Sequence, residues 1–294
     1  MSNDQFSRYG PVTYLLDLPV RAIQALPKLL PHRISLDVVG WLARRVLAPI
    51  FRTNRRIMEN LAHAWPELSK SEIRNICAAA NDNAARLMIE SLNTKGFIRH
   101  AAKAPMTGDG VAPLMSALKA DRPVVLVSGH FGNFHVVRVL LMQQGYDSAA
   151  IYRPLTNGYT NARFQKSLSD IATTNVPRGM KGTKTLVSRL RSGKAIAILN
   201  DQAAFEGVNL TFFGKPARTM LSAAELALKF NALLVPCYGI RRANGVDFDV
   251  EVEAPVPHTT AEEMTQALND SLEAVIRRYP GQWFWLHRRW KNFD

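Results

Sequence analysis

The chain has 294 residues, of which 47% are hydrophobic and 21% charged, so it can bury a sizeable core and is neither disordered nor a collagen-like repeat. It carries 37 Lys and Arg against 24 Asp and Glu, and the formal net charge of +13 favours an anionic partner. The two cysteines, Cys77 and Cys237, lack the paired spacing of a zinc or redox site, and we expect buried thiols in a reducing compartment.

The first 60 residues predict an amphipathic helical segment. Between Pro11 and Phe51, large apolar residues alternate with Arg and Lys, and charges and prolines interrupt every stretch long enough to span a membrane. This composition is typical of helices that lie in a membrane interface, and packing against the rest of the protein is the alternative. We therefore divide the chain into a membrane-associating segment, residues 1–60, and a main domain, residues 61–294.

The main domain begins with a helical stretch at residues 68–98, after which short β-branched runs alternate with helical segments. The expected strands are residues 123–128, 148–152, 195–199, 232–239 and 246–252, and the expected helices are residues 133–144, 157–172, 183–191, 221–230 and 261–278. This alternation predicts an α/β fold with a mostly parallel central sheet flanked by helices. The last strand alternates apolar and acidic residues, so we expect it at an edge of the sheet.

The sequence SGHFGNF at residues 128–134 follows the first of these strands and opens a helix. Ligands of open α/β sheets bind at the carboxyl ends of the strands, and Gly129 and Gly132 allow the backbone a tight turn there. His130 is therefore a candidate general base, although a single histidine is more often structural than catalytic.

Two further strand ends carry polar residues. Arg153 follows the second strand in IYRPL, and Asp201 follows the third in LNDQ. Three strand ends that deliver His, Arg and Asp to one edge of a sheet predict a functional site, whereas ordinary capping of loop ends is the alternative.

Five ordered motifs give the chain a resemblance to the lipid A biosynthesis (late) acyltransferase family, within the lysophospholipid acyltransferase superfamily. They are SGHFGNF (128–134), IYRPL (151–155), LNDQ (199–202), the segment 208–242 and PGQWFWLHRRWK (280–291), and the resemblance covers about residues 50–291. It implies a glycerol-3-phosphate acyltransferase-like fold and a peripheral location on the cytoplasmic face of the bacterial inner membrane. The implied reaction moves a fatty acyl chain from acyl carrier protein or coenzyme A to a hydroxyl of an amphipathic lipid, such as a lipid A precursor.

The chain departs from the family at one position. The family pattern is a histidine followed, after four residues, by an acidic residue, but the residue in that place is His135. An acid holds the catalytic imidazole in one tautomer and stabilises the imidazolium, and a second imidazole brings no negative charge. Either another carboxylate serves, with Asp201 the first candidate and Glu206 the second, or the activity is weakened or lost.

The remaining site residues are assigned roles around this dyad. Backbone N–H groups near Gly132 and Asn133 are candidate donors to the oxyanion, and Arg153 is expected to bind a phosphate or carboxylate. Thr219 can cap the next helix, and Lys215 and Arg218 present charge at a turn. The full set of expected substrate-binding residues is Gly132, Asn133, His135, Arg153, Gln202, Glu206, Lys215, Arg218 and Thr219. We expect no metal and no cofactor apart from the acyl thioester.

The C-terminal aromatic residues are expected to pack against the domain with an outward basic rim. His287 in this tail is expected to be structural, as are His32, His63, His100 and His258. The expected partners are the acyl carrier protein or coenzyme A thioester, a lipid acceptor and an anionic membrane surface. Nucleic acid is excluded because the positive charge is dispersed and no binding motif occurs.

Two alternatives to acyl transfer onto a lipid A precursor stay open, one a different acceptor and the other a loss of activity. A lyso-aminolipid would offer a hydroxyl on its amide-linked chain and an anionic head group for Arg153. A catalytically impaired relative that only binds lipid rests on the substitution at His135.

Overall fold

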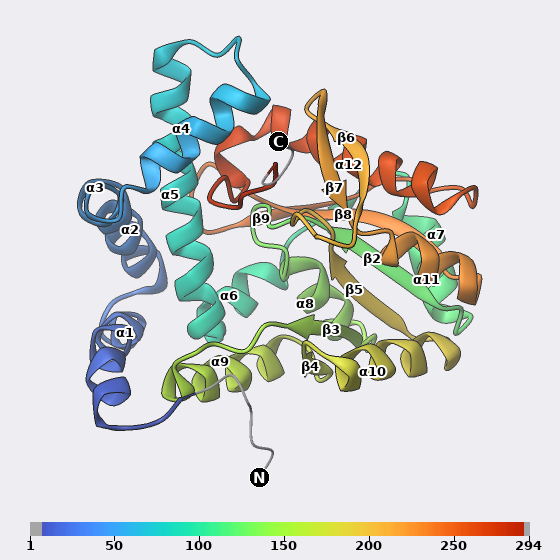
Figure 1. Ribbon diagram of the computed structural model, residues 1–294. Coiled ribbons are helices and arrows are strands. Elements are labelled where there is room, and N and C mark those ends of the chain that lie inside the picture. Colours follow the sequence, from blue (N-terminus) through green and yellow to red (C-terminus); the bar gives the residue numbers. More distant parts are fainter. Residues whose placement is uncertain (1–7, 291–294) are drawn as a thin grey trace.

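The computed structural model describes residues 8–290, except for the side chains of residues 23 and 26–28. The chain begins with helices at one side of the molecule: α1 (Pro11–Leu29), α2 (His32–Leu42), a π-helical turn (Ala43–Leu47) and α3 (Ala48–Ile50) (Figure 1). The next helix, α4 (Thr53–Ala64), crosses the expected boundary at residue 60.

The stretch expected as one helix is two, α5 (Lys70–Leu92) and α6 (Thr94–Ala101). A capping box starts α5, because the Ser69 side chain accepts a hydrogen bond from the Glu72 backbone and the Glu72 side chain accepts one from Ser69. The helices separate at Asn93, whose φ of −136° and ψ of 78° lie outside the helical region.

A seven-stranded sheet in the described part of the chain has the order β1-β9-β8-β2-β5-β3-β4. Its strands are β1 (Met106–Thr107), β2 (Val124–Ser128), β3 (Ser148–Tyr152), β4 (Asn175–Pro177), β5 (Ala195–Leu199), β8 (Leu233–Arg241) and β9 (Phe248–Val252). Every neighbouring pair is parallel except β8 and β9, which confirms the predicted mostly parallel α/β sheet. The edge position expected for β9 is wrong, because the short β1 pairs with its outer side.

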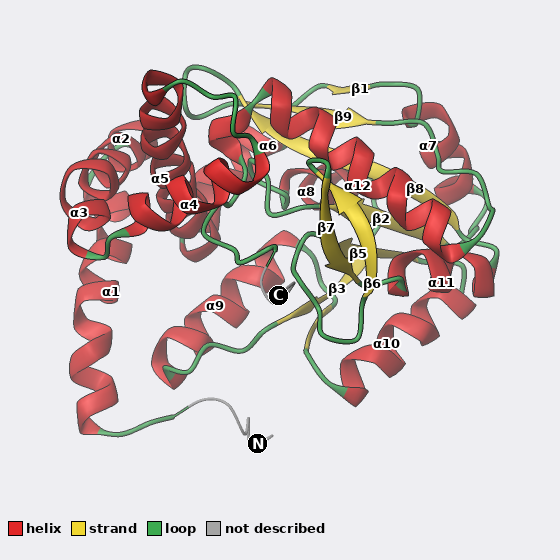
Figure 2. Ribbon diagram, turned by 45° about the horizontal axis from the view of Figure 1, so that its top comes forward, coloured by secondary structure: helices red, strands yellow, loops and turns green. Residues whose placement is uncertain are grey.

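Helices cover both faces of the sheet (Figure 2). One face packs on α6, α7 (Val111–Lys119), α8 (Val136–Gln143) and α9 (Gly158–Ile171), and the other on α10 (Met180–Arg191), α11 (Ser222–Phe230) and α12 (Ala261–Arg278). Successive residues of β2 alternate between these cores: Val124 and Leu126 face the first, and Val125 and Val127 face the second. The buried hydrophobic run of β2 thus fixes the strand in the middle of the molecule.

A third core lies beyond the carboxyl end of the sheet. It joins α4 and α5 to the C-terminal aromatic residues and to a hairpin of β6 (Val208–Phe212) and β7 (Lys215–Thr219), which stands out from the sheet in Figures 1 and 2. The hairpin turns through Phe213 and Gly214, both with positive φ. Trp283 and Trp285 are buried here, as expected, but Arg289 is buried with them rather than part of an outward rim.

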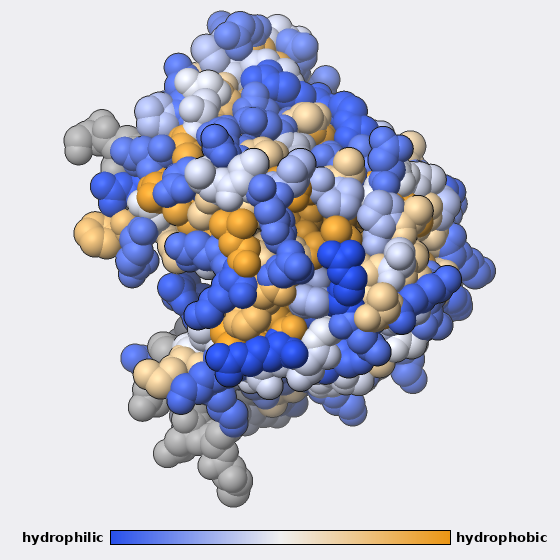
Figure 3. Space-filling model, turned by 90° about the vertical axis from the view of Figure 1, so that its right-hand side faces the viewer, coloured by the Kyte–Doolittle hydropathy of each residue, from blue (hydrophilic) through white to orange (hydrophobic). Residues whose placement is uncertain are grey.

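Most of the exposed large apolar side chains in the described residues lie between Tyr9 and Phe51, on α1 to α3. Among them, Leu16 is 69% exposed and Phe51 is 70% exposed. The opposite side of the molecule is largely hydrophilic at its margins, with apolar patches between (Figure 3). Within the described residues, no helix has both the length and the apolar character needed to span a membrane.

Both cysteines are buried, as expected. Burial raises the pKa of Cys77 to about 11 and that of Cys237 to about 12, so both remain protonated near neutral pH.

Candidate active site

His130 and Asp201 meet at the carboxyl ends of the adjacent strands β2 and β5. His130 Nδ1 lies 2.7 Å from Asp201 Oδ1, and the backbone N–H of His130 donates to Asp201 Oδ2 at 2.8 Å. The carboxylate is fully buried, whereas the His130 side chain is 23% exposed. The imidazole therefore has one nitrogen on a buried acid and an edge open toward solvent.

The charge state of Asp201 decides the tautomer of His130. Burial raises the pKa of Asp201, but the adjacent His130, its hydrogen bonds and the nearby His287 together lower it well below the usual range. An ionised carboxylate only accepts hydrogen bonds, so Nδ1 of His130 carries the proton that it shares with Asp201. In the neutral ring, Nε2 then carries the free electron pair of a general base.

Tight turns hold the His130 loop in place. Gly132 has a φ of +53°, and a Cβ there would lie 1.9 Å from the carbonyl oxygen of Gly239 on β8. At Gly129 a Cβ would meet Leu272 at 2.8 Å and Asp201 Oδ2 at 3.2 Å. Both positions therefore need glycine, as the sequence indicated, because the loop lies directly against β8, α12 and the Asp201 carboxylate.

The C-terminal segment locks this loop from outside. Phe284 N–H donates to His130 O at 2.9 Å, and Gly132 N–H donates to Gln282 O at 2.9 Å. From the same segment, Trp283 Nε1 donates to Asp201 Oδ2 at 2.8 Å. Trp283 was expected only to pack, and no sequence signal distinguished it from the other tryptophans of the tail.

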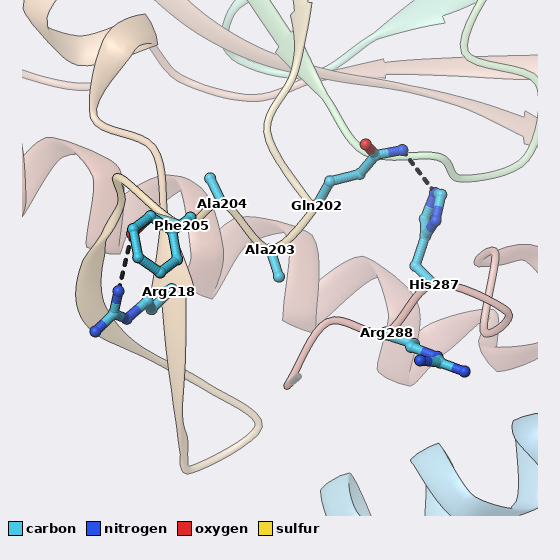
Figure 4. A pocket seen from close by; sticks show the side chains of 7 residues that line it. All are labelled: Gln202, Ala203, Ala204, Phe205, Arg218, His287 and Arg288. Carbon is cyan, nitrogen blue, oxygen red and sulfur yellow. Dashed lines mark hydrogen bonds between the residues drawn. The ribbon is translucent and has the colours of Figure 1, made fainter. Parts of the chain in front are cut away.

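His287 was expected only as a structural residue of the tail, and the structure places it against His130. Its ring centroid lies 4.5 Å from that of His130, and its Nε2 lies 3.2 Å from Gln202 Nε2 (Figure 4). Burial and the neighbouring His130 lower the pKa of His287 to about 4, so this ring is neutral near pH 7. This position could not be predicted from the sequence, because His287 and His130 are 157 residues apart and only the tertiary fold brings them together.

A pocket of about 430 Å³ opens beside the dyad. Its walls are the loop after β5, the hairpin and the C-terminal segment, and its lining residues are Gln202, Ala203, Ala204, Phe205, Arg218, His287 and Arg288 (Figure 4). Arg218 is oriented by a 2.8 Å hydrogen bond from Nη1 to Phe205 O. The pocket thus offers the positive charge of Arg218 and Arg288 next to an imidazole, and two of the expected substrate-binding residues, Gln202 and Arg218, line it.

The dyad and His287 are also close enough to hold a cation, since one ligand atom from each lies within 4.8 Å of the others. Asp201 Oδ1 is engaged by His130 Nδ1, and Oδ2 accepts two N–H groups. A metal ion on this carboxylate would have to replace these hydrogen bonds. The residues therefore fit acid–base chemistry better than metal binding.

The expected oxyanion donors are not supported. Gly132 N–H donates to Gln282 O, and Asn133 N–H donates to Gly239 O at 3.0 Å. The Asn133 side chain is buried and donates to Glu90 Oε2 at 2.9 Å. Both residues therefore build the loop rather than contact a substrate.

His135 and Glu206 also differ from expectation. His135 is buried, does not line the pocket, and has a pKa that burial and the nearby Arg138 and His130 lower to about 3. Glu206 is exposed on the loop after β5, whereas the carboxylate that contacts His130 is that of Asp201, the first candidate.

Three further expected residues lie around the site without lining the pocket. Arg153 is exposed after β3, which neighbours β5, and Lys215 lies at the turn end of the hairpin. Thr219 does not cap α11, which starts at Ser222. Instead the buried Thr219 hydroxyl donates to Ala217 O and accepts from Arg289 Nη2 at 2.6 Å.

The sequence is similar to known lipid acyltransferases of bacteria. The model of the bacterial lipid A biosynthesis acyltransferase family matches residues 8–292. A lipid A biosynthesis lauroyltransferase of Escherichia coli is 24% identical over 278 residues, 90% of this chain and 87% of that protein. A phosphatidylinositol mannoside acyltransferase of Mycobacterium tuberculosis is 24% identical over 277 residues, 85% and 86% of the two chains. Its counterpart in Mycolicibacterium smegmatis is 27% identical over 183 residues, 60% of each.

The family match, over most of this α/β chain, shows that its class is that of the acyl-transferring enzymes. The chain belongs to the bacterial lipid A biosynthesis acyltransferase family, and it is an acyltransferase of lipid biosynthesis.

Proposed function

We propose that this protein transfers a fatty acyl chain from an acyl thioester to a hydroxyl of an amphipathic lipid, with His130 as the general base and Asp201 as the acid that orients it. The single observation that carries the proposal is the 2.7 Å contact between His130 Nδ1 and the buried Asp201 carboxylate. This pair supplies the negative charge that His135 lacks, and it therefore favours an active enzyme over an impaired lipid-binding relative.

The proposed reaction uses both residues and needs no other acid or base. His130 Nε2 takes the proton of the acceptor hydroxyl as its oxygen attacks the thioester carbonyl carbon. The tetrahedral intermediate collapses with cleavage of the C–S bond, and the imidazolium returns the proton to the departing thiolate. Asp201 stays ionised and stabilises the imidazolium, and Trp283 Nε1 keeps the carboxylate in place.

The pocket beside the dyad suits an acidic portion of one substrate. Arg218 and Arg288 line it, and Arg153 lies on the loop after β3, the strand next to β5. The donor is an acyl carrier protein or coenzyme A thioester, and the charge of +13 favours the acidic carrier.

The acceptor belongs to the lipids that the related enzymes are named for. A lipid A precursor is the first choice, and a phosphatidylinositol mannoside has the same chemistry of a free hydroxyl on a glycolipid. A lyso-aminolipid is the alternative. The exposed apolar side chains of α1 to α3 fit a peripheral location on the cytoplasmic face of the inner membrane.

The test is an acyl-transfer assay with purified enzyme, radiolabelled acyl carrier protein and coenzyme A thioesters, and each acceptor in turn. We expect a product that depends on His130, with His130→Gln slower by about 10²-fold or more. His63→Gln, at an exposed histidine, is the control and should retain activity. No product from any pair, or full activity of His130→Gln, would refute the proposal.

A further inference from the structure

A second cavity, of about 1010 Å³, lies among α1, α2, α6 and α9, and it shares no lining residue with the pocket beside His130. Figures 1 and 2 show α1 and α2 on the side of the molecule away from α7 and α11. The proposed acyl transfer makes no use of this cavity.

Its rim is strongly basic. Six Arg or Lys residues line it against one carboxylate, Asp170, and the six are Arg21, Arg33, Lys95, Arg99, Arg163 and Lys166. Asp17 neutralises part of this charge, because it pairs with Arg21 and Arg163. The remaining four are exposed and have no ion pair within residues 8–290, so the cavity presents a net positive field.

Its floor holds unpartnered donors. Gln24 is 7% exposed, and its Oε1 accepts a hydrogen bond from Arg163 Nε at 2.6 Å. A guanidinium can only donate, so the amide orientation is fixed and Nε2 is the free donor. Among the described residues, the amide nitrogens Nε2 of Gln24 and Nδ2 of Asn93 are buried donors without a partner, the ring nitrogen Nε2 of His32 is also buried without one, and all three residues line the cavity. A buried donor without a partner is costly, so this arrangement indicates an acceptor-rich ligand.

Two helices begin at the same place. The first residues of α2, His32 and Arg33, and those of α6, Thr94 to Gly96, line the cavity. The first N–H groups of a helix have no partner within it, and its dipole favours negative charge there. Gly96 lets the helices meet, because a Cβ would lie 2.3 Å from His32 Nδ1. The two N-termini add to the charge and the donors as features of a phosphate site.

The cavity also has apolar lining residues. Ala25, Leu30 and Leu92 line it, and the neighbouring Leu29 is 79% exposed. A purely hydrophilic anion would leave these side chains uncovered, whereas an amphiphile would cover them. We infer that the cavity binds the phosphate head group of an anionic lipid, with the acyl chains along α1 and α2.

The test measures binding of three soluble probes by isothermal titration calorimetry: dihexanoyl phosphatidylglycerol, dihexanoyl phosphatidylcholine and inorganic phosphate. The variant Lys95→Glu/Lys166→Glu reverses two charges on the rim, and Lys119→Glu/Lys184→Glu makes the same change of net charge at exposed sites on α7 and α10. A third variant, Gln24→Glu, keeps an acceptor for Arg163 but replaces the free donor with negative charge. Circular dichroism melting confirms that each variant folds.

We expect the wild type to bind the phosphatidylglycerol about tenfold or more tightly than either other probe, and both the rim variant and Gln24→Glu to lose about tenfold or more of that affinity. The control pair should stay within about twofold. Equal losses in the rim and control pairs, or phosphate bound as tightly as the lipid, would overturn the inference. These results are independent of the acyl-transfer assay, since no variant touches His130, Asp201 or the pocket beside them.

Discussion

His135 is a buried histidine, and its burial makes it a determinant of stability against acid. Its pKa of about 3 in the folded protein compares with about 6.5 in an unfolded chain. Between these values the unfolded state holds the extra proton, so lowering the pH favours unfolding by up to about 1.4 kcal/mol per pH unit from this group.

We predict that His135→Gln flattens the decline of stability between pH 6.5 and 4.5, while His287, with its pKa of about 4, keeps part of that decline. Urea unfolding at several pH values measures the slope. The exposed His63→Gln is the control and should decline like the wild type. If the stability of His135→Gln declines with pH like that of the wild type, the claim that His135 is buried in its neutral form is wrong.

Gly132 is the residue at which the loop geometry is most demanding. Gly132→Ala forces a side chain into a positive φ and against Gly239 O, and we predict a loss of more than about 2 kcal/mol of unfolding free energy. Gly145 also has a positive φ, but a Cβ there meets nothing within 4 Å. Gly145→Ala should therefore cost only about 1 kcal/mol. Equal losses in chemical denaturation would contradict the close approach to β8.

At the scale of elements, the C-terminal segment is a clamp on Asp201, the acid that we propose orients His130. Trp283 and Trp285 are both buried and both donate one indole hydrogen bond, to Asp201 Oδ2 and to Pro280 O respectively. Substitution of either by Phe should cost a similar amount of stability, about 1 to 3 kcal/mol, because each removes one hydrogen bond of a buried indole.

Activity should separate the two tryptophans. We predict that Trp283→Phe lowers kcat about tenfold at nearly unchanged KM, because Asp201 loses a positioning contact, while Trp285→Phe stays within about twofold. Steady-state kinetics with matched melting curves makes the comparison. A larger loss of kcat in Trp285→Phe than in Trp283→Phe would contradict the role of the clamp.

At the scale of the whole molecule, the exposed apolar helices α1 to α3 are expected to carry membrane binding. Leu16 on α1 and Met180 on α10 are exposed to a similar extent, 69% and 76%. Leu16→Gln should weaken sedimentation with phosphatidylglycerol-containing vesicles about fivefold or more, because one apolar side chain is lost from the interface. Met180→Gln should bind like the wild type, and equal weakening by both would argue against an N-terminal membrane surface.

Sequence patterns predicted the sheet because buried strands such as β2 are continuous apolar runs bounded by turn residues. They did not predict β1 or β4, which are two and three residues long and carry no hydrophobic period. The break at Asn93 was missed because the apolar spacing continues through it.

The contact between His130 and Asp201 was predictable because parallel strands bring their carboxyl ends to one edge, and β2 and β5 are neighbours there. The oxyanion assignment to Gly132 and Asn133 failed because their N–H partners, Gln282 and Gly239, come from distant parts of the chain. Trp283 and His287 reach the site through the fold of the tail, a tertiary feature that no local pattern records.

The central claim is that His130 and Asp201 act as one unit, and a double-mutant cycle on the rate of acyl transfer tests it most directly. Asp201→Asn keeps the shape of the acid but removes its charge, and we predict a loss of about 10²-fold or more in kcat. The double variant His130→Gln/Asp201→Asn should be no slower than His130→Gln alone, because groups that act together are not additive. The exposed Glu206→Gln is the matched carboxylate control and should keep its activity. Full activity of Asp201→Asn, or losses that add in the double variant, would contradict the account.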